Sequence, residues 1–109
     1  MRKKYTELPR VTNFFQGQSA QVCAEYMEIV NMLEQNGRLV MPFGEALPQF
    51  DLYAIRIIRA ANVRVFYIYG KNDRIFGLHA YEKKTQKIPI HERKIAQKIA
   101  SILKQKVYI

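Results

Sequence analysis

Three runs of β-branched and aromatic residues follow one another in the second half of the chain. They are Leu52–Arg59, Val63–Tyr69 and Arg74–Tyr81. Residues of these types suit the pleated surface of a β-sheet. The segments between the runs, residues 60–62 and 70–73, are short enough for hairpins, and the second contains glycine, asparagine and aspartate. The pattern therefore predicts an antiparallel meander, which must be covered on at least one face because its strands are so apolar.

Helices on either side of the meander can supply that cover. Residues Ala20–Asn36 are predicted to be helical, with Ser19 as the N-cap and Gly37 ending the helix. One face of this helix carries the apolar residues Val22, Tyr26, Ile29, Val30 and Leu33. A last helix is expected to open at Ile88-Pro89-Ile90, and its apolar stripe consists of Ile95, Ile99, Ile102 and Leu103.

The remaining segments are weaker in pattern. Lys4–Leu8 fits a short strand that Pro9 either ends or confines to a sheet edge. Residues 38–50 contain two prolines and a glycine, and within them a turn of helix fits Glu45–Leu47. Together these elements predict one α+β domain over residues 1–109, with about four strands packed against two or three helices.

Composition excludes several classes of protein. No apolar run approaches the ~20 residues of a membrane span, and the basic start has no apolar stretch of a signal peptide behind it. We therefore expect a cytoplasmic protein that does not enter a membrane. The single cysteine, Cys23, has no partner for an internal disulfide.

The net charge of +9 comes from the second half of the chain, where residues 51–109 hold thirteen of the 18 Lys/Arg but four of the nine acids. This imbalance favours an anionic partner.

The sequence contains none of the common motifs that bind a metal ion or a cofactor. The sequence has no phosphate-binding glycine loop and no nucleophile elbow. His79 and His91 lack the spacing of a zinc pair, and the acids of the basic half are scattered over turns. We expect neither a metal nor a cofactor.

What remains is a set of cations interleaved with aromatic residues. Arg56 and Arg64 lie on the first two strands of the meander, where cross-strand neighbours on one face are ~5 Å apart. Guanidinium groups suit phosphate oxygens, and tyrosine rings suit base stacking. The pattern by itself also fits a solvated strand face and a lysine-rich loop with no ligand. It leaves open whether the basic face binds RNA without cleaving it, or holds an acidic protein partner.

Residues 52–89 resemble a known family. The segments Leu-Tyr-Ala-Ile-Arg-Ile, Val-Arg-Val-Phe-Tyr-Ile-Tyr and Arg-Ile-Phe-Gly-Leu-His-Ala-Tyr-Glu-Lys-Lys-Thr-Gln-Lys-Ile-Pro are similar, in order and spacing, to motifs of the RelE/HigB toxin superfamily. The phage-derived HigB-like branch is the most similar. Two features depart from its pattern: Ala54 stands where a glutamate is usual, and residues 60–62 replace a glycine-rich turn.

The resemblance implies a compact RelE-like fold of the microbial-ribonuclease type and the toxin of a type II toxin-antitoxin system. Such a toxin cleaves mRNA, typically on the ribosome, and a RelB- or HigA-like antitoxin neutralises it. By motif position the candidate catalytic residues are Arg56, Arg64, Lys83, Lys84 and His79. The candidate RNA-binding residues are Arg59, Tyr67, Tyr81 and Lys87. Because RNA carries its own nucleophile, the 2′-hydroxyl, cations can support cleavage without a metal.

Overall fold

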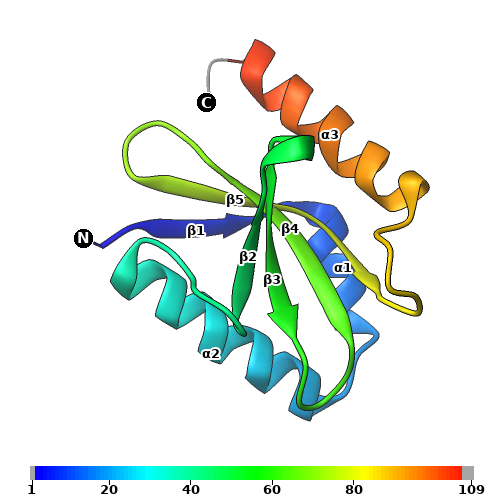
Figure 1. Ribbon diagram of the computed structural model, residues 1–109. Helices are drawn as coiled ribbons and strands as arrows, with labels where there is room; N and C mark the ends of the chain where they lie inside the picture. The colour runs from blue at the N-terminus through cyan, green and yellow to red at the C-terminus, as the bar shows by residue number, and fades with distance from the viewer. Residues whose placement is uncertain (1, 107–109) are drawn as a thin grey trace.

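The computed structural model of the protein describes residues 2–106, which form a single mixed sheet with helices on both faces (Figure 1). The strands are β1 (Lys4–Glu7), β2 (Gly44–Leu47), β3 (Leu52–Ile57), β4 (Val63–Tyr69) and β5 (Arg74–Glu82). The helices are α1 (Pro9–Gln16), α2 (Ala20–Asn36), the short 3-10 helix η1 (Pro48–Phe50) and α3 (Ile90–Gln105).

The meander predicted from the three apolar runs is confirmed as the centre of this sheet. The strand order is β1-β5-β4-β3-β2, and β2 to β5 pair antiparallel. The N-terminal strand β1 joins β5 in parallel, with Tyr5 opposite Ile75 and Glu7 opposite Gly77. A register shift between Phe66 and Tyr67 marks an irregularity in the β4–β5 pairing. The sheet therefore has five strands, one more than expected.

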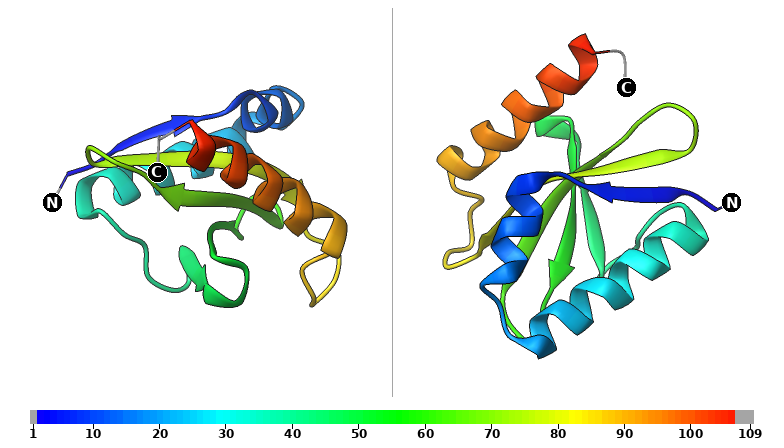
Figure 2. Two further views of the ribbon diagram at one scale, coloured as in Figure 1. Left: turned by 90° about the horizontal axis from the view of Figure 1, so that it is seen from above. Right: turned by 180° about the vertical axis from the view of Figure 1, so that it is seen from behind.

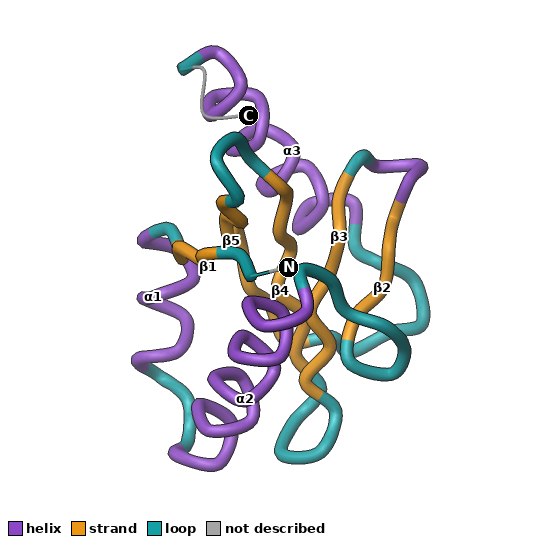
Figure 3. The backbone as a smooth tube through the Cα atoms, turned by 90° about the vertical axis from the view of Figure 1, so that its left-hand side faces the viewer, coloured by secondary structure: helices purple, strands orange, loops and turns teal. Residues whose placement is uncertain are grey.

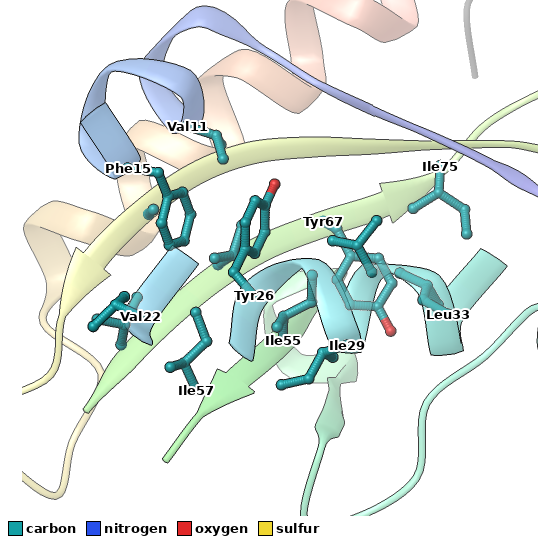
Figure 4. Packing of buried hydrophobic residues seen from close by; sticks show 14 residues of the cluster. Val11, Phe15, Val22, Tyr26, Ile29, Leu33, Ile55, Ile57, Tyr67 and Ile75 are labelled. Atoms are coloured by element: carbon teal, nitrogen blue, oxygen red, sulfur yellow. The ribbon is translucent and has the colours of Figure 1, made fainter. Parts of the chain in front are cut away.

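One face of the sheet is covered by α1 and α2, which Figure 3 shows together at one side of the strands and Figure 2 shows from behind. Figure 4 shows the core between them, in which aromatic rings and branched side chains interdigitate. Phe15 of α1 stacks on Tyr26 of α2 with ring centroids 3.9 Å apart. The amphipathic pattern predicted for residues 20–36 is confirmed, since Val22, Tyr26, Ile29, Val30 and Leu33 are all buried. Burial of this stripe supplies most of the stability of such a helix.

The ends of α2 also agree with the prediction. The Ser19 hydroxyl accepts a hydrogen bond from the backbone N–H of Val22 at 3.2 Å. Gly37 adopts the left-handed conformation, with φ 78°, and its N–H donates to the carbonyl of Leu33. Glycine tolerates this conformation because it has no Cβ.

The opposite face is covered by α3. Its buried side chains, Ala96 and Leu103, pack with Leu52, Phe66 and Leu78 of the sheet. The expected apolar stripe is only partly right, because Ile102 is 44% exposed. None of the helices in residues 2–106 combines the length and apolar character that crossing a membrane requires.

Two segments differ from the prediction. Pro9 does not simply end a strand but opens α1, where its fixed φ and missing N–H suit the first helical position. The turn of helix expected at Glu45–Leu47 is wrong: Gly44–Leu47 is the edge strand β2, paired with β3. Pairing with β3 satisfies the backbone hydrogen-bonding groups of β2, and a pattern of four residues does not predict such a pairing.

Candidate functional site

A row of three polar side chains crosses the centre of the sheet on the face that α3 covers. Arg56 of β3 is the register partner of Arg64 of β4, and Arg64 is the partner of Tyr81 of β5. The predicted cross-strand approach of the two arginines is therefore confirmed. The row lies toward the ends of β3 and β5 and the start of β4, in the lower part of Figure 1. Its Tyr81 packs in the core on the α3 side.

A polar hollow of about 410 Å³ opens at this end of the sheet. Its lining consists of Arg56, Asn62, Arg64, Lys83, Lys84, Thr85 and Gln86. Four of the five expected catalytic residues thus share one hollow, and no acidic side chain is among the residues that line it. We call this group of residues the cationic hollow.

The two arginines are held differently. Arg64 is 5% exposed, and its Nη1 donates to Asn62 Oδ1 at 3.1 Å and to the Val63 carbonyl at 3.2 Å. Its Nε has no hydrogen-bond partner in the described part of the chain. Arg56 is half-buried and donates from Nη1 to the carbonyl of Pro42 at 3.0 Å. One guanidinium is thus fixed with a free donor, and the other lies at the rim.

Asn62 also closes the hollow by joining the β3–β4 hairpin to the end of β5. Its Nδ2 donates to the Lys83 carbonyl at 2.9 Å, and the Lys83 N–H donates to the Asn62 carbonyl at 2.7 Å. These bonds fix the backbone of Lys83 beside Arg64. Sequence reasoning treated Asn62 only as a turn residue, because its contacts join segments 21 residues apart.

The cations of the hollow perturb one another. Burial, followed by the nearby charge of Arg56, lowers the pKa of Arg64. Burial and the charges of Arg64 and Arg56 also lower the pKa of Lys83. Crowding of like charges in a partly desolvated site costs free energy, and an anion bound there relieves it.

Tyr81 ends the polar row. It is 4% exposed, and its hydroxyl has no hydrogen-bond partner among residues 2–106. Burial, opposed by the charge of Arg64, raises the pKa of Tyr81 to about 12. The hydroxyl therefore keeps its proton at neutral pH and can act as a hydrogen-bond donor.

His79 lies one row away on the same face, opposite Phe66. It is buried, and its Nε2 lies 2.6 Å from Oε1 of Glu92 in the first turn of α3. Its Nδ1 has no partner within the described residues. The side chain thus ties β5 to α3 and does not line the cationic hollow.

Glu45 was not among the predicted site residues. It lies on β2 opposite Ala54, on the same face as its strand neighbour Leu47, which packs with the α3 side of the core. Its charge acts on Arg64, Tyr81 and Lys83. The alternation of a strand could have placed Glu45 on this face, but the segment was expected to be helical.

Three of the expected RNA-binding residues lie elsewhere. Tyr67 is 1% exposed and belongs to the core under α2, on the other face of the sheet. Arg59 pairs with Glu28 of α2 at 3.0 Å. Lys87 is exposed in the loop before α3 and does not line the hollow. A one-residue alternation decides the first case, since Tyr67 and its neighbour Phe66 point to opposite faces.

A second hollow, of about 500 Å³, lies toward the other end of the sheet, between η1 and α3. Phe50, Leu52 and Ile68 form its apolar part, and Lys104 is the single cation among its lining residues. It is larger but poorly suited to a polyanion. Among residues 2–106, no three His, Cys, Asp or Glu side chains come together as ligands for a metal ion.

Comparison with known proteins places the chain in a family. Residues 13–101 match the family described as Phage derived protein Gp49-like (DUF891). No curated protein sequence matches the chain. Among solved structures, the chain is similar to a mutant of the E. coli toxin RelE in the free state, with a TM-score of 0.62 and 12% identity over 98% of this chain and 99% of that one.

The family match covers α2, the meander and most of α3, and therefore includes every residue of the cationic hollow. The structural similarity extends over the whole sheet and confirms the expected RelE-like α+β fold. The chain therefore has a RelE-like fold and belongs to the phage-derived Gp49-like family.

Proposed function

We propose that the protein is the toxin of a type II toxin-antitoxin system and a metal-independent endoribonuclease that cleaves mRNA on the ribosome. One observation carries this proposal: Arg56, Arg64, Lys83 and Lys84 line a single hollow on the sheet. Four cations in one concave site suit the phosphate groups of a nucleic-acid backbone. RNA is the substrate that supplies its own nucleophile, so the protein needs no metal-bound water.

Each cation has a role in this scheme. Arg64 and Arg56, which both line the hollow, clamp the non-bridging oxygens of the scissile phosphate with their guanidinium groups. Preorganised donors of this kind stabilise the charge that develops on phosphorus. Lys83, with its lowered pKa, donates the proton to the leaving 5′-oxygen. Lys84, which is exposed, adds positive charge at the rim.

The products of this reaction are a 2′,3′-cyclic phosphate and a 5′-hydroxyl. Tyr81 supports this arrangement as the register neighbour of Arg64, since its hydroxyl is buried and Tyr81 does not line the hollow. His79 remains a candidate for acid–base work. It is the weaker candidate, because its Nε2 is engaged by Glu92 and its Nδ1 is buried.

The expected protein partner is an antitoxin of the RelB or HigA kind. A segment bearing carboxylates can cover the cationic hollow and relieve the mutual repulsion of Arg64 and Lys83. Such a partner competes with RNA for the same face.

Induced expression in bacteria tests the proposal. Arg56→Ala removes a half-buried cation from the rim of the hollow, and Arg64→Ala removes the buried one. Both are expected to abolish growth arrest and cleavage of translated messages. Arg10→Ala is the matched control, since Arg10 is exposed on α1 and this helix covers the opposite face. It removes the same charge and should leave toxicity unchanged.

Two outcomes would contradict the catalytic scheme. Equal toxicity of the wild type and the Arg64→Ala variant would remove Arg64 from the mechanism. Binding of RNA or ribosomes by the wild-type protein, with messages left intact, would instead favour a binding module without catalysis. Separately, strong antitoxin binding by a Lys83/Lys84/Lys87→Ala triple variant, with no effect of these changes on RNA cleavage, would favour an interaction subunit whose basic face holds an acidic partner.

A further inference from the structure

Glu45 is an acidic side chain that lies beside the arginine row of the sheet, next to the cationic hollow but outside its lining. It occupies the row formed by Glu45, Ala54, Phe66 and His79, which lies next to the row of Arg56, Arg64 and Tyr81. Alternation along β2 places it on the same face as Leu47, which packs with the α3 side of the core. Glu45 is half-buried, and no hydrogen bond or ion pair involving its carboxylate is seen within the described residues.

Cleavage through the 2′-hydroxyl requires a group that accepts a proton, and the cations of the hollow cannot do so. Arginine stays protonated in proteins, and lysine is largely protonated at neutral pH. Tyr81 keeps its proton because its pKa is about 12. Among residues 2–106, the ionisable acceptors placed on this face are Glu45, Asp51, Glu92 and His79. Asp51 lines the second hollow, toward the other end of the sheet. Glu92 and His79 bind each other at 2.6 Å and lie away from the lining of the hollow.

Glu82 is close in sequence but not equivalent. It follows Tyr81 at the end of β5, its side chain is 58% exposed, and its carboxylate lies 3.8 Å from the ammonium group of Lys84. Its register partner is Val63, whose side chain packs in the core under α2. Glu82 therefore lies on the other face of the sheet, and Glu45 is the carboxylate placed beside the arginine pair.

We propose that Glu45 is the general base of the reaction, an inference that rests on the proposed ribonuclease function. Its carboxylate takes the proton of the 2′-hydroxyl as the 2′-oxygen bonds to phosphorus. The bond from phosphorus to the 5′-oxygen breaks, and Lys83 protonates that oxygen. Glu45 leaves the step as a carboxylic acid and Lys83 as an amine, and exchange with water restores both. No metal ion or other reactant is needed.

The edge strand explains how a carboxylate can work beside so many cations. Arg56 and Arg64 come from β3 and β4 and Lys83 directly follows β5, whereas Glu45 comes from β2 at the sheet edge and does not line the hollow itself. RNA bound by the arginines therefore lies between the cations and the base. The neighbour of Glu45 in its row is Ala54, whose methyl group carries no polar atom to neutralise the carboxylate.

The test compares Glu45→Gln with Asp73→Asn, which neutralises an exposed carboxylate in the β4–β5 turn, at the other end of the strands, where it lies 3.3 Å from Lys3. Cleavage of a short message on purified ribosomes is measured in single turnover, and affinity is measured with the same message carrying a 2′-deoxy sugar at the cleavage site. We expect Glu45→Gln to slow cleavage about 100-fold or more, the usual contribution of a general base. Binding should be unchanged or tighter, because a negative charge near RNA is removed. Glu45→Asp should recover part of the rate, and Asp73→Asn should behave as the wild type.

Each other result is decisive in the opposite direction. Cleavage by Glu45→Gln at about the wild-type rate would overturn the role of Glu45 and leave the ribonuclease proposal intact. A loss of binding together with cleavage would identify Glu45 as a structural residue and overturn its role as base. A wild-type protein that binds the message without cleaving it would overturn both proposals. Circular dichroism spectra and melting temperatures of all variants show whether each is folded.

Discussion

The hairpin that carries both arginines depends on one buried carboxylate, and this dependence gives a measurable prediction. Glu25 of α2 is 4% exposed. Its oxygens accept hydrogen bonds from the backbone N–H groups of Ile58 at 2.8 Å, Arg59 at 3.1 Å and Ala60 at 2.8 Å. Residues 58–60 begin the connection between β3 and β4, so this carboxylate fixes the loop that joins the strands of Arg56 and Arg64.

Glu25→Ala removes all three acceptor contacts. A hydrogen bond to a charged group contributes about 1.5–3 kcal/mol. The three are not additive, because Ile58 and Arg59 are 43% and 62% exposed and their N–H groups can reach water once released. We therefore expect a loss of about 2–4 kcal/mol in the free energy of unfolding. For a chain of this size that corresponds to a fall in melting temperature of about 8 °C or more.

The same carboxylate gives the stability a pH dependence of known sign. Burial alone would raise the pKa of Glu25, but the N–H groups of Ala60, Arg59 and Ile58 and the charge of Arg59 bring it below its ordinary value. A carboxylate with a lowered pKa stabilises the fold above its unfolded pKa of about 4.3, and this contribution disappears as the pH falls through the lower, folded value. The stability difference between wild type and Glu25→Ala should therefore be largest near neutral pH and shrink in acid.

Urea unfolding followed by circular dichroism between pH 3 and 7 measures this difference. Glu28→Ala is the control, because Glu28 lies on the same helix, is 58% exposed and pairs with Arg59 at 3.0 Å. An exposed pair of this kind contributes about 1 kcal/mol or less. If Glu25→Ala were as stable as Glu28→Ala, or if the difference between them grew in acid, the argument from the three N–H donors would be refuted.

Three further predictions follow from packing and charge. A Cβ added at Gly77 would come within 2.0 Å of the Tyr5 hydroxyl and 2.7 Å of its ring, so Gly77→Ala should cost about 1–3 kcal/mol in urea unfolding, and Tyr5→Leu in the same chain should restore part of it. The Tyr26 hydroxyl lies 2.9 Å from that of Tyr5 and donates to Glu7 at 2.8 Å, so Tyr26→Phe should lower the unfolding free energy by about 1–3 kcal/mol; an unchanged value would mean that the remaining groups are hydrated. With four cations around the hollow, the logarithm of the binding constant for single-stranded RNA should fall with the logarithm of the salt concentration with a slope of about −3, and Lys84→Ala should make this slope shallower by about 0.7. Fluorescence anisotropy at several salt concentrations measures both slopes. A slope near zero would contradict phosphate binding by these cations.

Local patterns were sufficient for the elements with a clear period. The meander, α2 and its caps followed from the enrichment of β-branched and aromatic residues and from the apolar spacing of the helix. The short elements α1 and β2 were missed, because eight and four residues carry too little pattern to compete with a proline or a glycine. Their identity depends on what they pack against or pair with.

The cationic residues of the site were predictable as types and in part as neighbours. Arg56 and Arg64 follow from a hairpin register that the strand lengths nearly fix. Tyr67 and Arg59 could not be placed, because a face assignment and an ion pair with α2 decide where they lie. Glu45 was not predicted as a site residue, because the strand that carries it was expected to be a turn of helix.

The sequence by itself determined that the chain has a basic half, a three-stranded meander and helices able to cover it, because these properties depend on composition and on periods of a few residues. Tertiary structure decided which cations share a hollow. It also decided that the Glu45 carboxylate lies on the same face of the sheet as the arginines and that the Glu25 carboxylate binds the loop after β3. Those relations join residues tens of positions apart, such as Glu25 with Ala60, and only the pairing and packing of the whole sheet bring them together.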